Sequence, residues 1–299
     1  MDMMNHDGIY HISLMEGQAR AILIESTAMV QKAMDTHRLS RTATAALGRT
    51  ITATAMMGSM LKGDKESVSV QIKGGGPIGT VLAVAHGDVT VKGYVDNPDV
   101  DLPRMGKKLN VGGAVGKDGK MTVIKDLGLK EPYVGQVNLV SGEIAEDFAM
   151  YFTASEQTPS LVSLGVLVDD EKVISAGGLI IQMLPNARES AIASVEYSAG
   201  MFMDISETMR EYHLEGAVDQ LLMHLQPVVL EKKVPHYQCD CSRGRIEKVL
   251  ISLGAEELTD MIETQQGAEV DCHFCNKRYK FSADDLKMLL EAATIREDE

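Results

Sequence analysis

The stretch ESVSVQIKGGGPIGTVLAVAHGDVTVKGYV, residues 66–95, decides the fold of the first part of the chain. Apolar and polar residues alternate in it with period two, as in VSVQIKG and VTVKGYV, which is typical of strands that bury one face. Glycine, proline and a Gly-Asp pair separate the alternating runs and indicate turns. The stretch therefore predicts an antiparallel sheet.

The glycine-rich segment KGGGPIG, residues 73–79, has the composition of a phosphate-binding loop. Such a loop continues into Gly-Lys-Ser/Thr and opens a helix, because the helix N-terminus carries part of the phosphate charge. Here no such sequence follows, and strands flank the segment on both sides. We therefore predict a tight connection between two strands.

The sequence around this sheet mixes strand and helix patterns. Ser40 is a candidate cap of one helix, and the Asp-Gly pair inside residues 116–120 predicts a hairpin with strands on both sides. Strand patterns occur at 16–26 and 160–184, and helix patterns at 28–38, 40–61 and 143–156. The fold class is therefore α/β in the mixed α+β sense, within an N-terminal core domain of residues 1–185.

Residues 187–225 carry helix patterns throughout, with Ile192, Val195 and Ala199 on one face. Gly200 and Gly216 interrupt the pattern, so the helices are marginal and need a neighbour to pack on. We predict a helical linker over 186–231. If it packs on the C-terminal domain, loss of that domain exposes apolar side chains, with Met201, Met203, Met209 and Met223 among them.

All four cysteines lie in the remaining segment, residues 232–299, as Cys239-Asp-Cys241 and Cys272-His-Phe-Cys275. The 30 residues between the two pairs predict two helices that are separated at Gly254. After the second pair, NKRYKF predicts a strand. A last helix is expected from Ser282, with Asp285 completing an approximate capping box, to about Thr294.

Two close cysteine pairs at this separation favour a metal site over a disulfide framework. Four thiolates suit one tetrahedral Zn(II) ion and leave no position for a substrate, so we expect a structural zinc bound by Cys239, Cys241, Cys272 and Cys275. Four alternatives remain open. These are an iron–sulfur cluster, four unrelated reduced thiols, replacement of one ligand by His273 or His236, and thiol–disulfide exchange at Cys-x-x-Cys.

The single residue between Cys239 and Cys241 is a tight spacing for zinc ligands. If the metal is lost, each pair can close into a small disulfide ring that is easily reduced again. Zinc keeps all four sulfurs as thiolates, which is the form that oxidants attack. A core of roughly 60 residues contributes only a few kcal/mol, whereas zinc contributes on the order of 10, so the domain is expected to unfold without the metal.

Length and composition restrict the function. At 299 residues the chain is about twice the usual domain size, and its formal charge of -14 disfavours nucleic-acid and anionic-lipid partners. The longest uncharged stretch, 173–187, is shorter than the roughly 20 residues of a membrane span. No Lys or Arg precedes Arg20, so we expect no targeting signal and a cytoplasmic location.

No nucleophile elbow or metal-ligand helix occurs, and we predict that the chain is not an enzyme.

The cysteine spacing resembles that of the redox-regulated heat shock protein 33 chaperones. SVQIKGGGPIG (69–79), YFTASEQ (151–157), AGGLIIQMLP (176–185) and CDCSRGR (239–245) are similar to signatures of that family. The resemblance covers nearly the whole chain, and all four cysteine positions match.

This resemblance implies an ATP-independent holdase that is inactive when reduced and bound to one Zn(II) ion per chain. Oxidation would form the disulfides Cys239–Cys241 and Cys272–Cys275, release zinc, unfold the C-terminal domain and destabilise the linker. The active form would bind unfolding client proteins and form a homodimer. The competing function, a zinc-ribbon nucleic-acid binder, is disfavoured because residues 232–299 contain 10 basic and 14 acidic residues, a net charge of -4.

Overall fold

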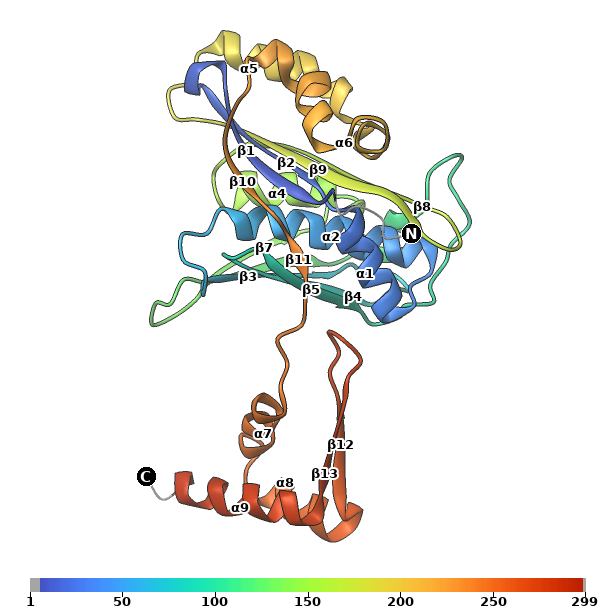
Figure 1. Cartoon of the computed structure of the whole chain (residues 1–299), viewed down its shortest axis with the longest axis vertical. Helices are drawn as coiled ribbons and strands as arrows, with labels where there is room; N and C mark the ends of the chain where they lie inside the picture. Colours follow the sequence, from blue (N-terminus) through green and yellow to red (C-terminus); the bar gives the residue numbers. More distant parts are fainter. Residues whose placement is uncertain (1–5, 298–299) are drawn as a thin grey trace. The chain divides into compact units, whose positions relative to one another are not determined.

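The protein is described by a computed structural model that covers residues 6–297 (Figure 1). The chain divides into two compact units, Met1–Gln238 and Cys239–Glu299. The first unit holds two sheets and most of the helices, and the second holds the four cysteines. The mixed α/β class expected from the sequence is confirmed.

The first sheet of the larger unit is antiparallel throughout. Most residues of its central strands are buried on both faces, because helices cover the sheet from both sides. In spatial order the strands are β10 (Val228–Lys233), β1 (Gly8–Leu14), β2 (Ala19–Glu25), β9 (Val173–Met183) and β8 (Ser160–Val168).

The second sheet contains the stretch quoted at the start. Its strands alternate between buried and half-buried residues, so one face packs on the core, and the predicted antiparallel sheet is confirmed. One short strand, β11, runs parallel to its neighbour β5. The order is β11 (His236–Tyr237), β5 (Thr90–Val95), β4 (Thr80–His86), β3 (Ser67–Lys73), β6 (Lys120–Asp126) and β7 (Tyr133–Asn138).

Helix α2 (Arg41–Ser59) lies between the two sheets and is buried along almost its whole length (Figure 1). Small residues allow this close packing: a Cβ atom at Gly58 would lie 2.7 Å from the Cβ atom of Ala85. The predicted cap is present, since Ser40 Oγ accepts a hydrogen bond from Ala43 N. Helices α1 (Thr27–His37) and α4 (Ala145–Ala154) contact the sheets as well.

The helices expected over 187–225 are present as α5 (Glu189–Ser198) and α6 (Ile205–Leu222), with short 3-10 turns after each. They pack on the first sheet, where Phe202, Ile205 and Met209 are buried against strand residues. Within the described residues of this unit, these helices therefore pack on the first sheet. Three of the four methionines named above, Met201, Met203 and Met223, are already exposed, whereas Met209 is buried.

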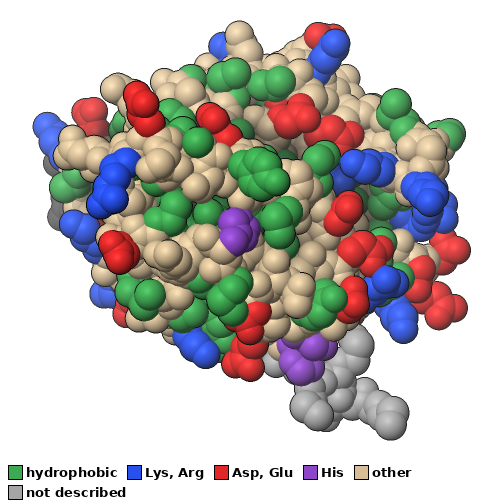
Figure 2. All heavy atoms as spheres, turned by 90° about the horizontal axis from the view of Figure 1, so that it is seen from above, with side chains coloured by type: hydrophobic (Ala, Val, Ile, Leu, Met, Phe, Trp, Pro, Cys, Tyr) green, Lys and Arg blue, Asp and Glu red, His purple; other side chains and the backbone are tan. Residues whose placement is uncertain are grey.

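Figure 2 shows the face that carries α5 and α6, where apolar side chains are scattered among charged ones. The exposed members from this segment are Ile192, Tyr197, Met201, Met203, Tyr212 and Met223. The folded helices therefore present separate apolar side chains to solvent.

The second unit is a small α/β domain. Two helices lie between the cysteine pairs, as predicted, and Gly254 between them has a positive φ of 95°. The predicted capping box is present, because Asp285 Oδ2 accepts from Ser282 N and Ser282 Oγ accepts from Asp285 N. The elements are α7 (Arg243–Ile251), α8 (Ala255–Asp260) continued by a π turn (Met261–Gln265), β12 (Gly267–Asp271), β13 (Arg278–Ser282) and α9 (Ala283–Glu297).

The predicted hairpin at residues 116–120 is wrong. A short helix, α3 (Val111–Val115), precedes this segment, and only β6 follows it. The Asp-Gly pair packs against the glycine-rich loop instead: Asp118 N donates to Gly74 O, and a Cβ atom at Gly119 would lie 1.8 Å from Lys73 O. The glycine-rich loop itself connects β3 and β4, as predicted.

Candidate metal centre

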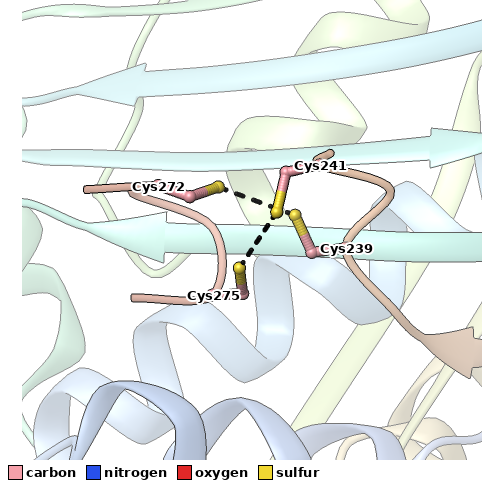
Figure 3. A group of neighbouring side chains, drawn as sticks. All are labelled: Cys239, Cys241, Cys272 and Cys275. Atoms are coloured by element: carbon pink, nitrogen blue, oxygen red, sulfur yellow. Dashed lines mark hydrogen bonds between the residues drawn. The ribbon is translucent and has the colours of Figure 1, made fainter. Parts of the chain in front are cut away.

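The four cysteines come from two loops that the secondary structure of the second unit holds together (Figure 3). Cys239 and Cys241 lie just before α7, whose N-cap residue Ser242 accepts a hydrogen bond from Arg245 N. Cys272 and Cys275 lie in the turn between β12 and β13. Local structure thus fixes each pair, and packing of the helices on the hairpin brings the pairs together.

The turn that carries the second pair is a tight knuckle. Cys275 N and Asn276 N both donate to Cys272 O, and Cys272 N donates to Lys277 O. Asn276 adopts a positive φ of 57°, which asparagine tolerates better than most residues. These bonds aim both sulfurs of the turn at the same point.

The sulfur positions fit one tetrahedral ion. All four Sγ atoms lie within 4.8 Å of one another, and the Cys239–Cys272 and Cys241–Cys275 Sγ distances are 3.7 and 3.4 Å. Four sulfurs placed about 2.3 Å from one zinc ion would be about 3.8 Å apart. An iron–sulfur cluster would spread its four thiolates farther apart, since they bind two or more iron ions and not one.

The alternative ligands do not join this group. Among the residues that the structure describes, the candidate metal-holding group consists of the four cysteines. His273 lies in the same turn but is not a member, and His236 lies in β11 of the first unit. The Cys-x-x-Cys pair lies in a turn between strands and lacks the helix N-terminus that lowers a thiol pKa in thiol–disulfide exchange enzymes.

Sequence reasoning missed one neighbour of the sulfurs, Tyr279 of β13. Its hydroxyl donates a hydrogen bond of 3.1 Å to Cys241 Sγ, and the side chain is almost completely buried. The alternation in NKRYKF could have placed Tyr279 and Phe281 on the inner face of the strand, because residues two apart share a face. The link to Cys241 depends on the packing of distant segments.

Cys241 accepts this hydrogen bond from a side-chain hydroxyl, whereas Cys275 accepts one from the backbone N–H of Lys277. Burial raises the pKa of Cys241, but hydrogen bonds, first that from Tyr279, outweigh burial and bring this pKa to about 7. Burial raises the pKa of Cys275 to about 11 and also raises that of Cys239. The bond to Cys241 raises the pKa of Tyr279 to about 12, so the hydroxyl stays protonated and remains a donor.

Charged pairs surround the centre. Arg245 of α7 forms an ion pair with Asp240, the residue between the first two cysteines. Arg278 forms a bidentate pair with Asp271, with N–O distances of 2.8 and 2.9 Å across the base of the knuckle. Both pairs are largely exposed and therefore add little stability, and each lies within one of the two cysteine-bearing segments.

The fold and the site together define a class of protein, in which a two-sheet α/β unit is joined to a small C-terminal unit with a four-cysteine metal-type centre. Residues 7–282 match the family model described as "Hsp33 protein". The chain belongs to the Hsp33 family, which is a family of chaperones, and the resemblance drawn from the sequence is confirmed.

Relatives support this assignment over nearly the whole length. The 33 kDa chaperonin of Alkaliphilus metalliredigens is 48% identical over 275 residues, which cover 91% of this chain and 94% of that protein. The 33 kDa chaperonin of Thermoanaerobacter sp. is 47% identical and covers 96% and 99%. The crystal structure of the 33 kDa chaperonin from Thermotoga maritima has a TM-score of 0.88 at 36% identity and covers 99% of this chain and all of that one.

No helix within residues 6–297 combines the length and apolar character needed to cross a lipid bilayer.

Proposed function

We propose that this protein is a redox-regulated, ATP-independent holdase that binds unfolding client proteins under oxidative stress. The observation that carries the proposal is the convergence of four sulfurs, all within 4.8 Å of one another, in a unit with a very small core. Membership of a chaperone family supports client binding. Regulation by oxidation is inferred from the chemistry of the sulfurs.

In the reduced form, Cys239, Cys241, Cys272 and Cys275 would hold one Zn(II) ion. A bound zinc ion would keep the sulfurs as thiolates and join the two loops of the domain. Besides Cys272, the described buried core of this unit consists of only five side chains, Leu250, Leu258, Tyr279, Phe281 and Leu286. So small a core contributes only a few kcal/mol, and the fold of the unit therefore depends on the metal site.

Oxidation would form the disulfides Cys239–Cys241 and Cys272–Cys275. For each bond, two thiolates give two electrons to one hydrogen peroxide molecule, the O–O bond breaks, and two protons from water complete two water molecules. With all four sulfurs in disulfides, no thiolate remains to hold the metal. The C-terminal unit would then lose its fold.

We further propose three functional regions: a core domain (1–185), a linker (186–231) and a redox-switch domain (232–299). The linker would become less stable in the active form, and its apolar side chains would bind clients. Met209 and the other residues buried against the first sheet would add to the side chains that are already exposed, such as Met203. The protein would act in the cytoplasm, form a homodimer on activation, and need neither nucleic acid nor membrane.

Light scattering from a thermally unfolding client protein, without nucleotide, tests the proposal. The chain is added either reduced with zinc or pretreated with peroxide. We expect the oxidised form alone to suppress aggregation. Equal suppression by both forms would contradict the switch, and suppression by neither would contradict the chaperone function.

The four cysteines can be tested in the same assay. A variant with Cys272 and Cys275 changed to serine lacks half of the ligands and is expected to suppress aggregation without oxidant. A variant with serine at the exposed Thr153 is the matched control and should behave as the wild type, because this site lies on α4 in the first unit.

A further inference from the structure

The hydroxyl of Tyr279 donates a side-chain hydrogen bond to the sulfur of Cys241, whereas Cys275 accepts a hydrogen bond from the backbone N–H of Lys277. The hydroxyl oxygen lies 3.1 Å from Cys241 Sγ, which is within hydrogen-bonding distance of a sulfur acceptor. Strand β13 fixes the ring, with Tyr279 paired to Val270 of β12. In the folded unit the donor is therefore held in place by the hairpin as well as by its contact with Cys241.

The surroundings of the ring keep the hydroxyl directed at the sulfur. Tyr279 is 6% exposed and belongs to the small core of the unit together with Leu258 and Phe281. The ammonium group of Lys277 lies 5.2 Å from the centre of the ring. The ring cannot turn away from Cys241 without disturbing this packing.

We propose that Tyr279 is a positioning residue that protects Cys241, by its hydrogen bond, from the first attack of oxidants and alkylating agents. This inference rests on the proposed function, in which all four sulfurs are thiolates in the reduced form. Among fully ionised thiolates, the sulfur that accepts a hydrogen bond has less electron density available and is the slower nucleophile. Cys241 should therefore react more slowly with the Tyr279 hydroxyl in place than without it.

The reaction concerned is attack of one thiolate on one peroxide molecule. The sulfur forms a bond to one oxygen, the O–O bond breaks, and the other oxygen leaves as hydroxide, which takes a proton to become water. A second thiolate then attacks the sulfur of this sulfenic acid, the S–S bond forms as the S–O bond breaks, and the hydroxide that leaves takes a proton to become water. Tyr279 keeps its proton throughout and acts only on the sulfur that it touches.

The expected size of the effect follows from general values. A hydrogen bond of ordinary strength changes the proton affinity of a sulfur about tenfold. Thiolate nucleophilicity follows proton affinity with an exponent of about 0.45, so loss of the bond should accelerate reaction at Cys241 about threefold.

The test uses the full-length, reduced, zinc-loaded chain and its Tyr279→Phe variant, which keeps the ring and removes only the hydroxyl. Each protein is treated with a limiting amount of iodoacetamide, so that most modified molecules carry one label, and peptide mass spectrometry gives the ratio of label at Cys241 to label at Cys272. We expect this ratio to rise about threefold in the variant. Tyr212→Phe, at an exposed tyrosine of α6, is the matched control and should leave the ratio unchanged.

The ratio separates protection from general loosening, because a less stable domain exposes all four sulfurs and raises every labelling rate together. A ratio in Tyr279→Phe equal to that of the wild type, or lower, would overturn the inference while leaving the zinc switch intact. Metal analysis precedes labelling. A reduced wild-type chain without zinc would contradict the proposed function, and the inference would fall with it.

Discussion

The carboxylate of Glu25 accepts a hydrogen bond from the backbone N–H of Leu214, with 2.9 Å between the nitrogen and Oε2. The other oxygen of Glu25 lies 3.0 Å from His213 Nδ1. His213 has φ 52° and ψ −175°, so α6 is broken at this residue and Leu214 begins a new helical segment. Glu25 of β2 thus caps the second half of α6 from a distant part of the sequence and ties it to the first sheet.

We expect Glu25→Ala to lower the free energy of unfolding by about 2–3 kcal/mol, because it leaves a buried N–H group without a partner. Urea unfolding followed by circular dichroism measures the change. Glu196→Ala, at an exposed site on α5, is the control and should stay within about 0.5 kcal/mol of the wild type. Equal effects of both substitutions would show that the cap contributes nothing.

Asp7 should make the stability of the first unit depend on pH. Burial raises its pKa from 3.8 to about 7, against the lowering effect of hydrogen bonds from Ala28 N and Met29 N. The folded chain therefore binds a proton more tightly than the unfolded chain, so the contribution of this group is greatest below about pH 4 and is lost as the pH rises to about 7.

Asp7→Asn removes this titration. We expect the wild type to lose stability relative to the variant between pH 5 and pH 8, as measured by the urea midpoint at each pH. Parallel pH profiles of the two proteins would refute the assignment to Asp7.

Removal of metal should unfold the second unit alone. Chelation of the reduced protein is expected to lower hydrogen-exchange protection in β12, β13 and α9 by at least about a thousandfold, because the small core cannot hold the fold. Amides of α2, buried between two sheets, serve as the internal control and should keep their protection. Retained protection in β13 would show that the domain folds without metal.

Two parts of the linker should differ in their response to oxidation. Residues 187–225 are expected to lose hydrogen-exchange protection after oxidation, with a larger loss in α5 than in residues 214–222, which Glu25 ties to the sheet. Peptide-resolved exchange before and after peroxide treatment measures both. Unchanged protection across 187–225 would contradict the proposed role of the linker.

Local chemistry explains which elements could be predicted from the sequence. Ser40 and the Ser282–Asp285 pair marked helix starts correctly, since a cap needs only neighbouring residues. Alternation predicted β3 to β5 because one face of that sheet is less buried. The strand at Gly8–Leu14 was missed since most of its residues are buried on both faces, which weakens alternation.

The parts that escaped prediction depend on contacts between distant residues. The Asp118–Gly119 pair has the composition of a hairpin turn, but packing against the glycine-rich loop gives it another conformation. The four cysteines could be chosen as the candidate site from spacing alone, because metal geometry restricts the spacing of ligands. Tyr279 could not be chosen as a neighbour of Cys241, and neither could Glu25 as a cap of α6.

The sulfur distances have a consequence for chain entropy. Two Sγ–Sγ distances below 4 Å run across the two pairs, 3.7 Å from Cys239 to Cys272 and 3.4 Å from Cys241 to Cys275. A disulfide across the pairs would close a loop of about 34 residues and stabilise the compact domain by about 4 kcal/mol, whereas a disulfide within Cys239–Cys241 encloses three residues and restrains the chain far less. Oxidation across the pairs would therefore lock the domain shut, and only oxidation within each pair leaves the chain between them free to expand.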